Sequence, residues 1–230
     1  MVASRVFLQT TSDSVDRTTY TFTGRSLGTA SIDRHILVCV ATRASGTTAL
    51  DVSNVAVAGV SADILLSNTN IASSGANTSA IAIIAVPSGT TGTIAVTFSR
   101  QVSRCGIITY ALYGIAPAPV DTDLSSGADP SSTTISIPAD GIAVAFDSGY
   151  IGSSGRNWTG LTSDGGVLVE AGLLVASASD ATVLAVSRSV TCDFTGSNPQ
   201  GRASLVAAWG PPSGGIFFRR TRHNRSGSRT

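Results

Sequence analysis

The sequence contains no lysine and a single glutamate, Glu170, although it is 230 residues long. Its charge comes from 15 arginines and 13 aspartates, and charged residues make up only 13% of the chain. Lysine and glutamate are common on helix surfaces, so their scarcity argues against a helical bundle. The low charge combined with 42% hydrophobic residues excludes a chain that is disordered throughout.

Long hydrophobic runs are missing as well. No stretch reaches the roughly 18 consecutive apolar residues that span a bilayer, so no contact with a membrane is expected. The residues that follow Met1 lack the basic and apolar sections of a signal peptide. These features predict a soluble protein that is not secreted by the standard route.

Cysteine and histidine are scarce. The three cysteines, Cys39, Cys105 and Cys192, lie far apart in apolar runs, and their odd number prevents complete pairing within one chain. Buried free thiols are therefore expected. The sequence has no CxxC motif and no histidine cluster, so we expect neither a metal site nor a cofactor.

Catalytic side chains are equally few, because two histidines, one glutamate and no lysine are available as acids, bases or nucleophiles. His35 follows Asp33 closely, which allows a Ser-His-Asp arrangement, but no G-x-S-x-G motif accompanies it. A histidine at the start of a strand is the favoured interpretation. We therefore expect no catalytic residues and a protein that is not an enzyme.

Glycine, serine, threonine, alanine and valine dominate the sequence, which favours short strands joined by tight turns. Residues 19–23 alternate threonine with aromatic side chains, and residues 36–40 form a continuous apolar run typical of a central sandwich strand. Residues 67–79 lack periodic apolar positions, which predicts a long surface loop. The pattern as a whole predicts an all-β fold.

The two halves of the chain repeat the same order of features. Phe98 and Phe194 lie 96 residues apart, and so do Tyr113 and Trp209. Two tandem β-sandwiches of immunoglobulin-like or jelly-roll type are therefore predicted, with a single large jelly roll as the alternative. The predicted segments are an N-terminal arm or edge strand (1–17), a first sandwich (18–116), a Pro/Asp/Ser-rich linker (117–132), a second sandwich (133–212) and an Arg-rich tail (213–230).

The C-terminal tail is strongly basic, because it holds five of the fifteen arginines. Gly214-Gly215 predicts a flexible joint before three bulky apolar residues, which would be exposed without reason in a solvated tail. We expect the tail to bind a protein partner rather than nucleic acid, because the body offers no basic face. A disordered solubilising end is the alternative. The expected partner-binding residues are Ile216, Phe217, Phe218, Arg219, Arg220, Arg222, Arg225 and Arg229.

Four segments resemble parts of structural proteins of tailed bacteriophages: residues 33–40 (DRHILVCV), 54–60 (NVAVAGV), 86–93 (VPSGTTGT) and 207–211 (AAWGP). The chain is similar to Gly/Ser/Thr-rich β-sandwich proteins that decorate heads or build tail fibres and spikes, and to repeated modules of bacterial surface proteins. The missing signal peptide favours the phage reading. The resemblance implies a non-enzymatic virion structural protein, foremost a capsid decoration or cement protein. It would be assembled in the host cytoplasm, form homo-oligomers, and be anchored to neighbouring capsid or tail subunits by its termini.

The alternative is a tail fibre, a spike, or a module that binds a receptor or carbohydrate. Trp158, Tyr150 and residues 67–79 would then form the recognition surface, because sugars stack on exposed aromatic rings. Trp158 falls at a strand position of the repeat, which favours its burial instead. A hydrolase that depends on His35 is a more distant alternative.

Overall fold

A computed structural model of the protein describes residues 2–73, 75–127, 130–150, 155–169, 172–195 and 200–212. Within these ranges the chain forms seventeen β-strands in four antiparallel sheets, which confirms the predicted all-β fold. We name the sheets A to D. No helix in the described ranges is long and apolar enough to cross a membrane.

The first unit consists of sheets A and B. Sheet A has five strands in the order β1-β9-β3-β7-β6, and sheet B has four in the order β2-β8-β4-β5. The strands are β1 (Ser4–Asp13), β2 (Arg17–Ser26), β3 (His35–Ala44), β4 (Val52–Val57), β5 (Val60–Ser61), β6 (Asp63–Ala72), β7 (Gly75–Ala85), β8 (Thr91–Val102) and β9 (Arg104–Tyr113).

The second unit consists of sheets C and D. Sheet C has the order β10-β17-β12-β15-β14, and sheet D has the order β11-β16-β13. The strands are β10 (Asp121–Ser126), β11 (Ser131–Ile137), β12 (Ile142–Tyr150), β13 (Gly155–Thr159), β14 (Thr162–Val169), β15 (Leu173–Ala181), β16 (Val186–Thr195) and β17 (Gln200–Trp209).

The two units have the same topology, which confirms the predicted repeat and the two sandwich-like units. Replacing β1, β9, β3, β7 and β6 by β10, β17, β12, β15 and β14 converts the order of sheet A into that of sheet C. Replacing β2, β8 and β4 of sheet B by β11, β16 and β13 likewise gives the order of sheet D. Phe98 and Phe194 occupy the equivalent strands β8 and β16, and Tyr113 and Trp209 end β9 and β17.

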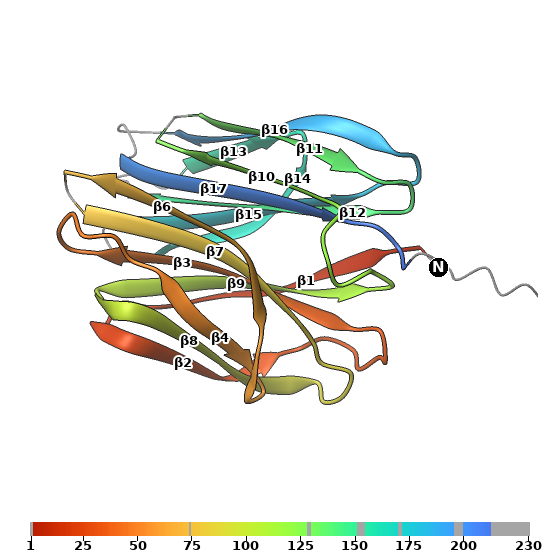
Figure 1. The fold of residues 1–230 in the computed structure, drawn as a ribbon, viewed down its shortest axis with the longest axis horizontal. Helices are drawn as coiled ribbons and strands as arrows, with labels where there is room; N and C mark the ends of the chain where they lie inside the picture. The colour runs from red at the N-terminus through yellow and green to blue at the C-terminus, as the bar shows by residue number, and fades with distance from the viewer. Residues whose placement is uncertain are drawn as a thin grey trace, which may run out of the picture.

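The four sheets stack as layers in the order B, A, C, D, from bottom to top of Figure 1. Sheets B and D have one solvent face, so their strands alternate: Tyr20 and Phe22 of β2 are buried whereas Thr19 and Thr21 are exposed. Sheets A and C are covered on both faces. Strands β3 and β12 therefore read as continuous buried runs.

A large apolar interface joins the two units. The cluster between sheets A and C includes Leu37, Ile81 and Ile108 from one unit and Val144 and Leu205 from the other, all at most 1% exposed. A second cluster fills the A/B sandwich, and two smaller ones fill the C/D sandwich. The apolar core between the units is therefore continuous with the protein interior and buries side chains as fully as the sandwich cores do.

The contacts between the units follow an approximate two-fold symmetry. Strand β1 packs against β14, the counterpart of β6, while β6 packs against β10, the counterpart of β1. Likewise β7 packs against β17, the counterpart of β9, while β9 packs against β15, the counterpart of β7. Equal faces thus meet each other, as in an isologous dimer whose subunits have been joined in one chain.

The structure describes three of the segments predicted from the sequence and leaves out a fourth. Within 1–17, β1 is the edge strand of sheet A, paired with β9. The expected linker, 117–132, is wrong as a purely connecting segment, because it contains β10, which pairs with β17, and the start of β11. The expected surface loop at 67–79 is also wrong, because its described residues lie almost entirely in β6 and β7. The Arg-rich tail, 213–230, lies outside the described residues.

Candidate functional site

Loops of both units meet at the end of the molecule where β1, β3, β10 and β12 begin. Strand pairing places Ser4 beside Tyr113 and Asp121 beside Ala208 at this end. Two backbone hydrogen bonds join the units here: Ala3 N donates to Asp140 O (3.0 Å) and Ala116 N donates to Gly210 O (3.0 Å). We call this region, which comprises residues 2–3, 27–34, 114–120, 138–141 and 182–185, the loop end.

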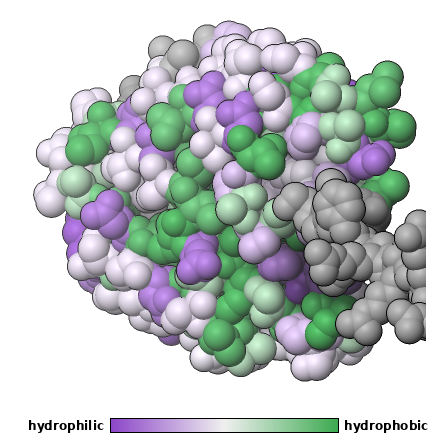
Figure 2. All heavy atoms as spheres, turned by 45° about the vertical axis from the view of Figure 1, so that its right-hand side comes forward, coloured by the Kyte–Doolittle hydropathy of each residue, from purple (hydrophilic) through white to green (hydrophobic). Residues whose placement is uncertain are grey.

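The loop end carries the most exposed large hydrophobic side chains of the described residues. Ile32 is 91% exposed, Leu184 78% and Val183 76%, and Val2 and Val120 are also more than half exposed. Figure 2 views this side of the molecule and shows hydrophobic residues, in green, gathered on it. Apolar side chains grouped on loops of two units are typical of a surface that binds another protein.

A groove of about 580 Å³ lies beside these loops, where β10, β11 and the start of β16 approach one another. Its apolar walls include Val120, Ile137, Pro138 and Val186, and Asp121 contributes a carboxylate. A second hollow shares Val186 and is lined by the exposed loop at 182–185. The groove and the exposed loop therefore form one continuous region.

Aspartates of β10 fix the edge strand that borders the groove. Asp121 Oδ2 accepts a hydrogen bond from Ser136 N, and Asp123 Oδ2 accepts one from Thr134 N, both 2.7 Å long. Strand β11 is at the edge of sheet D, so its outward amides would otherwise offer a template for another strand. The sequence predicted a linker for the segment that holds Asp121 and Asp123, so their capping role was missed.

Arg34 holds the loops of the first unit in place. Its side chain is fully buried and donates to the carbonyl oxygens of Val86, Gly28, Ser88 and Gly89 at 2.7–3.0 Å. Satisfied buried donors of this kind make a loop rigid. Ile32 is therefore displayed on a loop that is anchored two residues further along the chain.

The residues considered for hydrolysis do not form a catalytic triad. Ser31 Oγ donates directly to the carboxylate of Asp33, and His35 Nδ1 lies 3.2 Å from the backbone oxygen of Asp33 rather than from its carboxylate. Hydrogen bonds from Ser31 and from Gly114 N hold the pKa of Asp33 below its ordinary value. A base that accepts the serine proton and is oriented by a carboxylate is not formed by these three groups.

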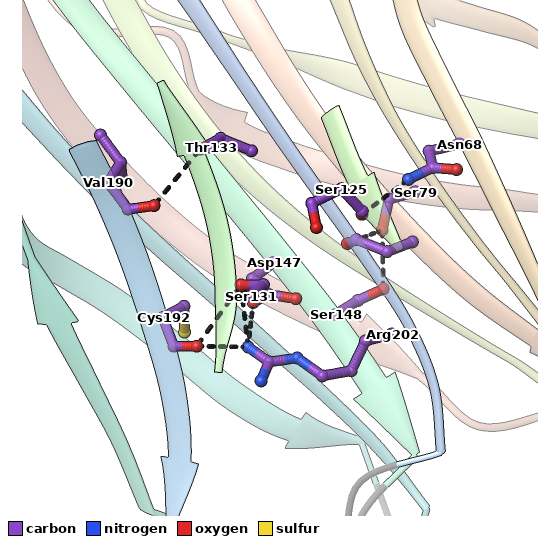
Figure 3. A network of polar contacts seen from close by, with 11 residues as sticks. Asn68, Ser79, Ser125, Ser131, Thr133, Asp147, Ser148, Val190, Cys192 and Arg202 are labelled. Atoms are coloured by element: carbon purple, nitrogen blue, oxygen red, sulfur yellow. Dashed lines mark hydrogen bonds and ion pairs between the residues drawn. The ribbon is translucent and has the colours of Figure 1, made fainter. Parts of the chain in front are cut away.

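A network of buried polar side chains lies between sheets C and D. Figure 3 shows Arg202 pointing between sheets C and D toward Ser131, Asp147 and Cys192. The guanidinium pairs with Asp147 and donates to Cys192 O (2.7 Å), while Ser131 Oγ donates to Asp147 Oδ2 (2.7 Å). Burial raises the pKa of the Asp147 carboxyl, and Arg202 and Ser131 oppose the rise. The network links the two sheets and is closed to substrate.

Polar side chains also cross the interface between the units. Ser79 Oγ lies 2.6 Å from Ser148 Oγ and donates to Ala203 O (3.1 Å), and Asn68 Nδ2 donates to Ser125 O (2.8 Å), as Figure 3 shows. These residues belong to the segment 67–79 or contact it. Some of its polar side chains thus bond to the other unit, which explains why a segment of strands resembles a loop in sequence.

The cysteines are buried and free, as predicted. Burial raises the pKa of Cys39, Cys105 and Cys192 far above the ordinary value, so none is a reactive thiolate at neutral pH. Among the described residues no group of three or more histidine, cysteine or acidic side chains is placed to hold a metal ion.

The aromatic residues considered for carbohydrate binding are occupied within the protein. Trp158 is only partly exposed and packs against two core clusters of the second unit. Tyr150 lies beneath the guanidinium of Arg43, 3.4 Å from the ring centre. Both rings thus already contact other residues of the protein, which leaves less of each ring for stacking on a sugar.

The predicted partner-binding residues, Ile216 to Phe218 and the five arginines from Arg219 to Arg229, lie outside the described residues. The exposed side chains of the loop end were missed. Val183 and Leu184 have a strand-like composition, and no sequence signal separates an apolar pair on an exposed loop from one in a strand.

Comparison with protein-family models gives no match, and neither does comparison with curated proteins. The fold and the site define the class: an all-β protein of four antiparallel sheets in two stacked sandwich-like units, with an apolar loop end.

Proposed function

We propose that the protein is a non-enzymatic structural component of a virion, most specifically a capsid decoration or cement protein. It would contact neighbouring capsid or tail subunits through its loop end and its basic tail, and associate with further copies of itself. The four-layer stack supports this role, because buried hydrogen bonds and an ion pair join its sheets and make the body rigid. A rigid body with its contacts left to loops and ends suits assembly on a particle.

The observation that carries the proposal is the grouping of Ile32, Val183 and Leu184, the three most exposed large hydrophobic side chains of the described residues, at one end. Ile32 belongs to the first unit, and Val183 and Leu184 belong to the second, so both units contribute to this end. Exposed apolar groups concentrated in this way are costly in water unless another surface covers them.

The surface can be tested with the double variant Val183→Asp and Leu184→Asp. We expect it to lose at least about tenfold in co-sedimentation with particles that lack the protein, because two charges would be desolvated on docking. The control is Val15→Asp, at an exposed position in the β1–β2 turn at the opposite end. Equal binding of both variants would contradict the proposal.

The tail is tested separately by deleting residues 214–230. The shortened protein should keep its circular dichroism spectrum but bind the particle less tightly, with a weaker dependence on salt. Retention of full, salt-dependent binding would remove the tail from the anchoring surface.

A further inference from the structure

The chain leaves the described region beside the groove. Gly210 is buried, and a Cβ atom built on it would lie 3.2 Å from Pro138 Cγ and 3.8 Å from Val120 Cγ1. Val120 and Pro138 are two of the apolar walls of the groove. Residues 211–212 follow directly, so the tail starts two residues after a position that contacts two walls of the groove.

The tail sequence provides a matching apolar segment at a suitable distance. Ile216, Phe217 and Phe218 follow Pro212 after only three residues, 213–215 (SGG). Four residues span at most roughly 14 Å, which is enough to turn back to a groove whose walls Val120 and Pro138 lie beside Gly210. A short flexible connection also gives the segment a local concentration on the order of millimolar, which favours its own chain over a second one.

The chemistry of the groove suits this occupant. Its walls include Ile137, Val186 and Ala185, and its volume of about 580 Å³ accommodates a few bulky side chains. Asp121 lines it and Asp140 stands in the adjacent turn at 138–141, whereas the apolar segment is followed at once by Arg219 and Arg220. Apolar surface would meet apolar surface, and acidic groups would meet basic ones.

We propose that Ile216, Phe217 and Phe218 pack into the groove of their own chain. The arginines that follow are then held at the loop end, beside Val183 and Leu184, and form one docking surface with the apolar loops. This deepens and rests on the proposed function, since of the tail residues only the arginines are left to face the partner, beside the apolar loops. The packing itself does not depend on what the partner is.

Disulfide trapping in the full-length protein tests the packing. Ser187→Cys places a thiol on the exposed rim of the groove, and Arg219→Cys places one next to the apolar segment. The native cysteines are buried and do not compete. Mild oxidation converts two neighbouring thiols into a disulfide, and non-reducing electrophoresis separates a cross-linked monomer from a dimer.

The matched control pairs Arg219→Cys with Ala30→Cys, an exposed position at the same end but outside the groove. We expect the Ser187 pair to form a monomeric cross-link at least tenfold faster than the Ala30 pair. Adding Phe217→Ser and Phe218→Ser should abolish this difference. A cross-linked dimer would make a second copy the occupant, and equal rates for both pairs would show a tail without a docking place; either result overturns the proposal.

The particle assay distinguishes this inference from the proposed function. A protein with Phe217→Ser and Phe218→Ser should bind particles more weakly than wild type while still binding through the apolar loops. Loss of the cross-link with unchanged particle binding would overturn the role of the segment in presenting the arginines and leave the proposed function intact.

Discussion

Two buried arginines illustrate how single residues hold this fold together. Arg202 faces Asp147 between sheets C and D, where both side chains are fully buried. Arg34 is buried as completely, and it donates hydrogen bonds to backbone carbonyl oxygens of two loops. In each case the guanidinium is used as a branched donor that joins segments far apart in sequence.

The buried ion pair should be costly to break from one side. Arg202→Met leaves the Asp147 carboxyl buried without its cation, so the free energy of unfolding should fall by about 3–5 kcal/mol. The double variant Arg202→Met and Asp147→Leu removes both charges and should recover most of that loss. Urea unfolding of the three proteins measures the difference; a double variant no better than the single one would argue against the ion-pair account.

Asp33 should make stability depend on pH in the acid range. Its pKa in the folded protein lies below the ordinary value of 3.8, because Ser31 and Gly114 N donate to its carboxylate. The unfolded chain therefore binds the proton more tightly, so the stabilisation is complete above pH 3.8 and is lost as the pH falls through the folded pKa. Asp33→Asn should flatten the melting temperature between pH 5 and pH 2.5, and an unchanged slope would speak against this role.

At the scale of elements, the edge strands determine how the sheets end. Strand β10 is the edge of sheet C and β11 the edge of sheet D, and Asp121 and Asp123 connect them by accepting from backbone amides of β11. Hydrogen bonds from backbone to side chain, rather than a continuous ladder of backbone hydrogen bonds, thereby join sheets C and D along one side. The same contacts occupy amides that an edge strand would otherwise expose.

Removing these caps should promote association. In Asp121→Ala with Asp123→Ala, the amides of Thr134 and Ser136 lose their acceptors, which should lower stability by about 1–3 kcal/mol and increase light scattering on heating. Asp63→Ala, which removes a carboxylate from the exposed start of β6, is the control and should behave like wild type. Equal scattering in both proteins would count against the capping role.

The sequence predicts individual strands well where the pattern of burial is simple. Alternation in β2 and continuous apolar residues in β3 identified these strands, because one has a solvent face and the other has none. The polar parts of β6 and β7, within 67–79, were missed because residues such as Asn77 and Ser79 bond to Gly201 and Ala203 of the distant β17. Such partners depend on the packing of the two units and leave no local signal.

At the scale of the whole molecule, the central interface decides how the protein behaves. The sequence predicted two sandwiches in tandem, and both are present, but their stacking through equal faces depends on tertiary contacts that no repeat pattern reveals. The loop end is a product of the same stacking, since Ile32 belongs to one unit and Val183 to the other. The loop end was therefore not predictable from the sequence, and the partner-binding role of the tail residues stays a prediction.

The shared interface predicts that both units unfold together. Phe98 is buried in the A/B core, and Phe98→Ala should cost about 3–5 kcal/mol there. Both tryptophans, Trp158 and Trp209, lie in the second unit, so their fluorescence reports on sheets that do not contain Phe98. Fluorescence and circular dichroism should show one transition with the same lowered midpoint. A tryptophan transition that stays at the wild-type midpoint would mean independent units.

The central claim, a structural role in a virion, is tested most directly by quantitative mass spectrometry of purified particles. The particles should come from a lysate of the strain that encodes this chain, and its copy number should be compared with that of the major capsid protein. A decoration or cement protein is expected in numbers comparable to the capsid protein. A handful of copies would transfer it to the tail, and absence from the particles would contradict the account.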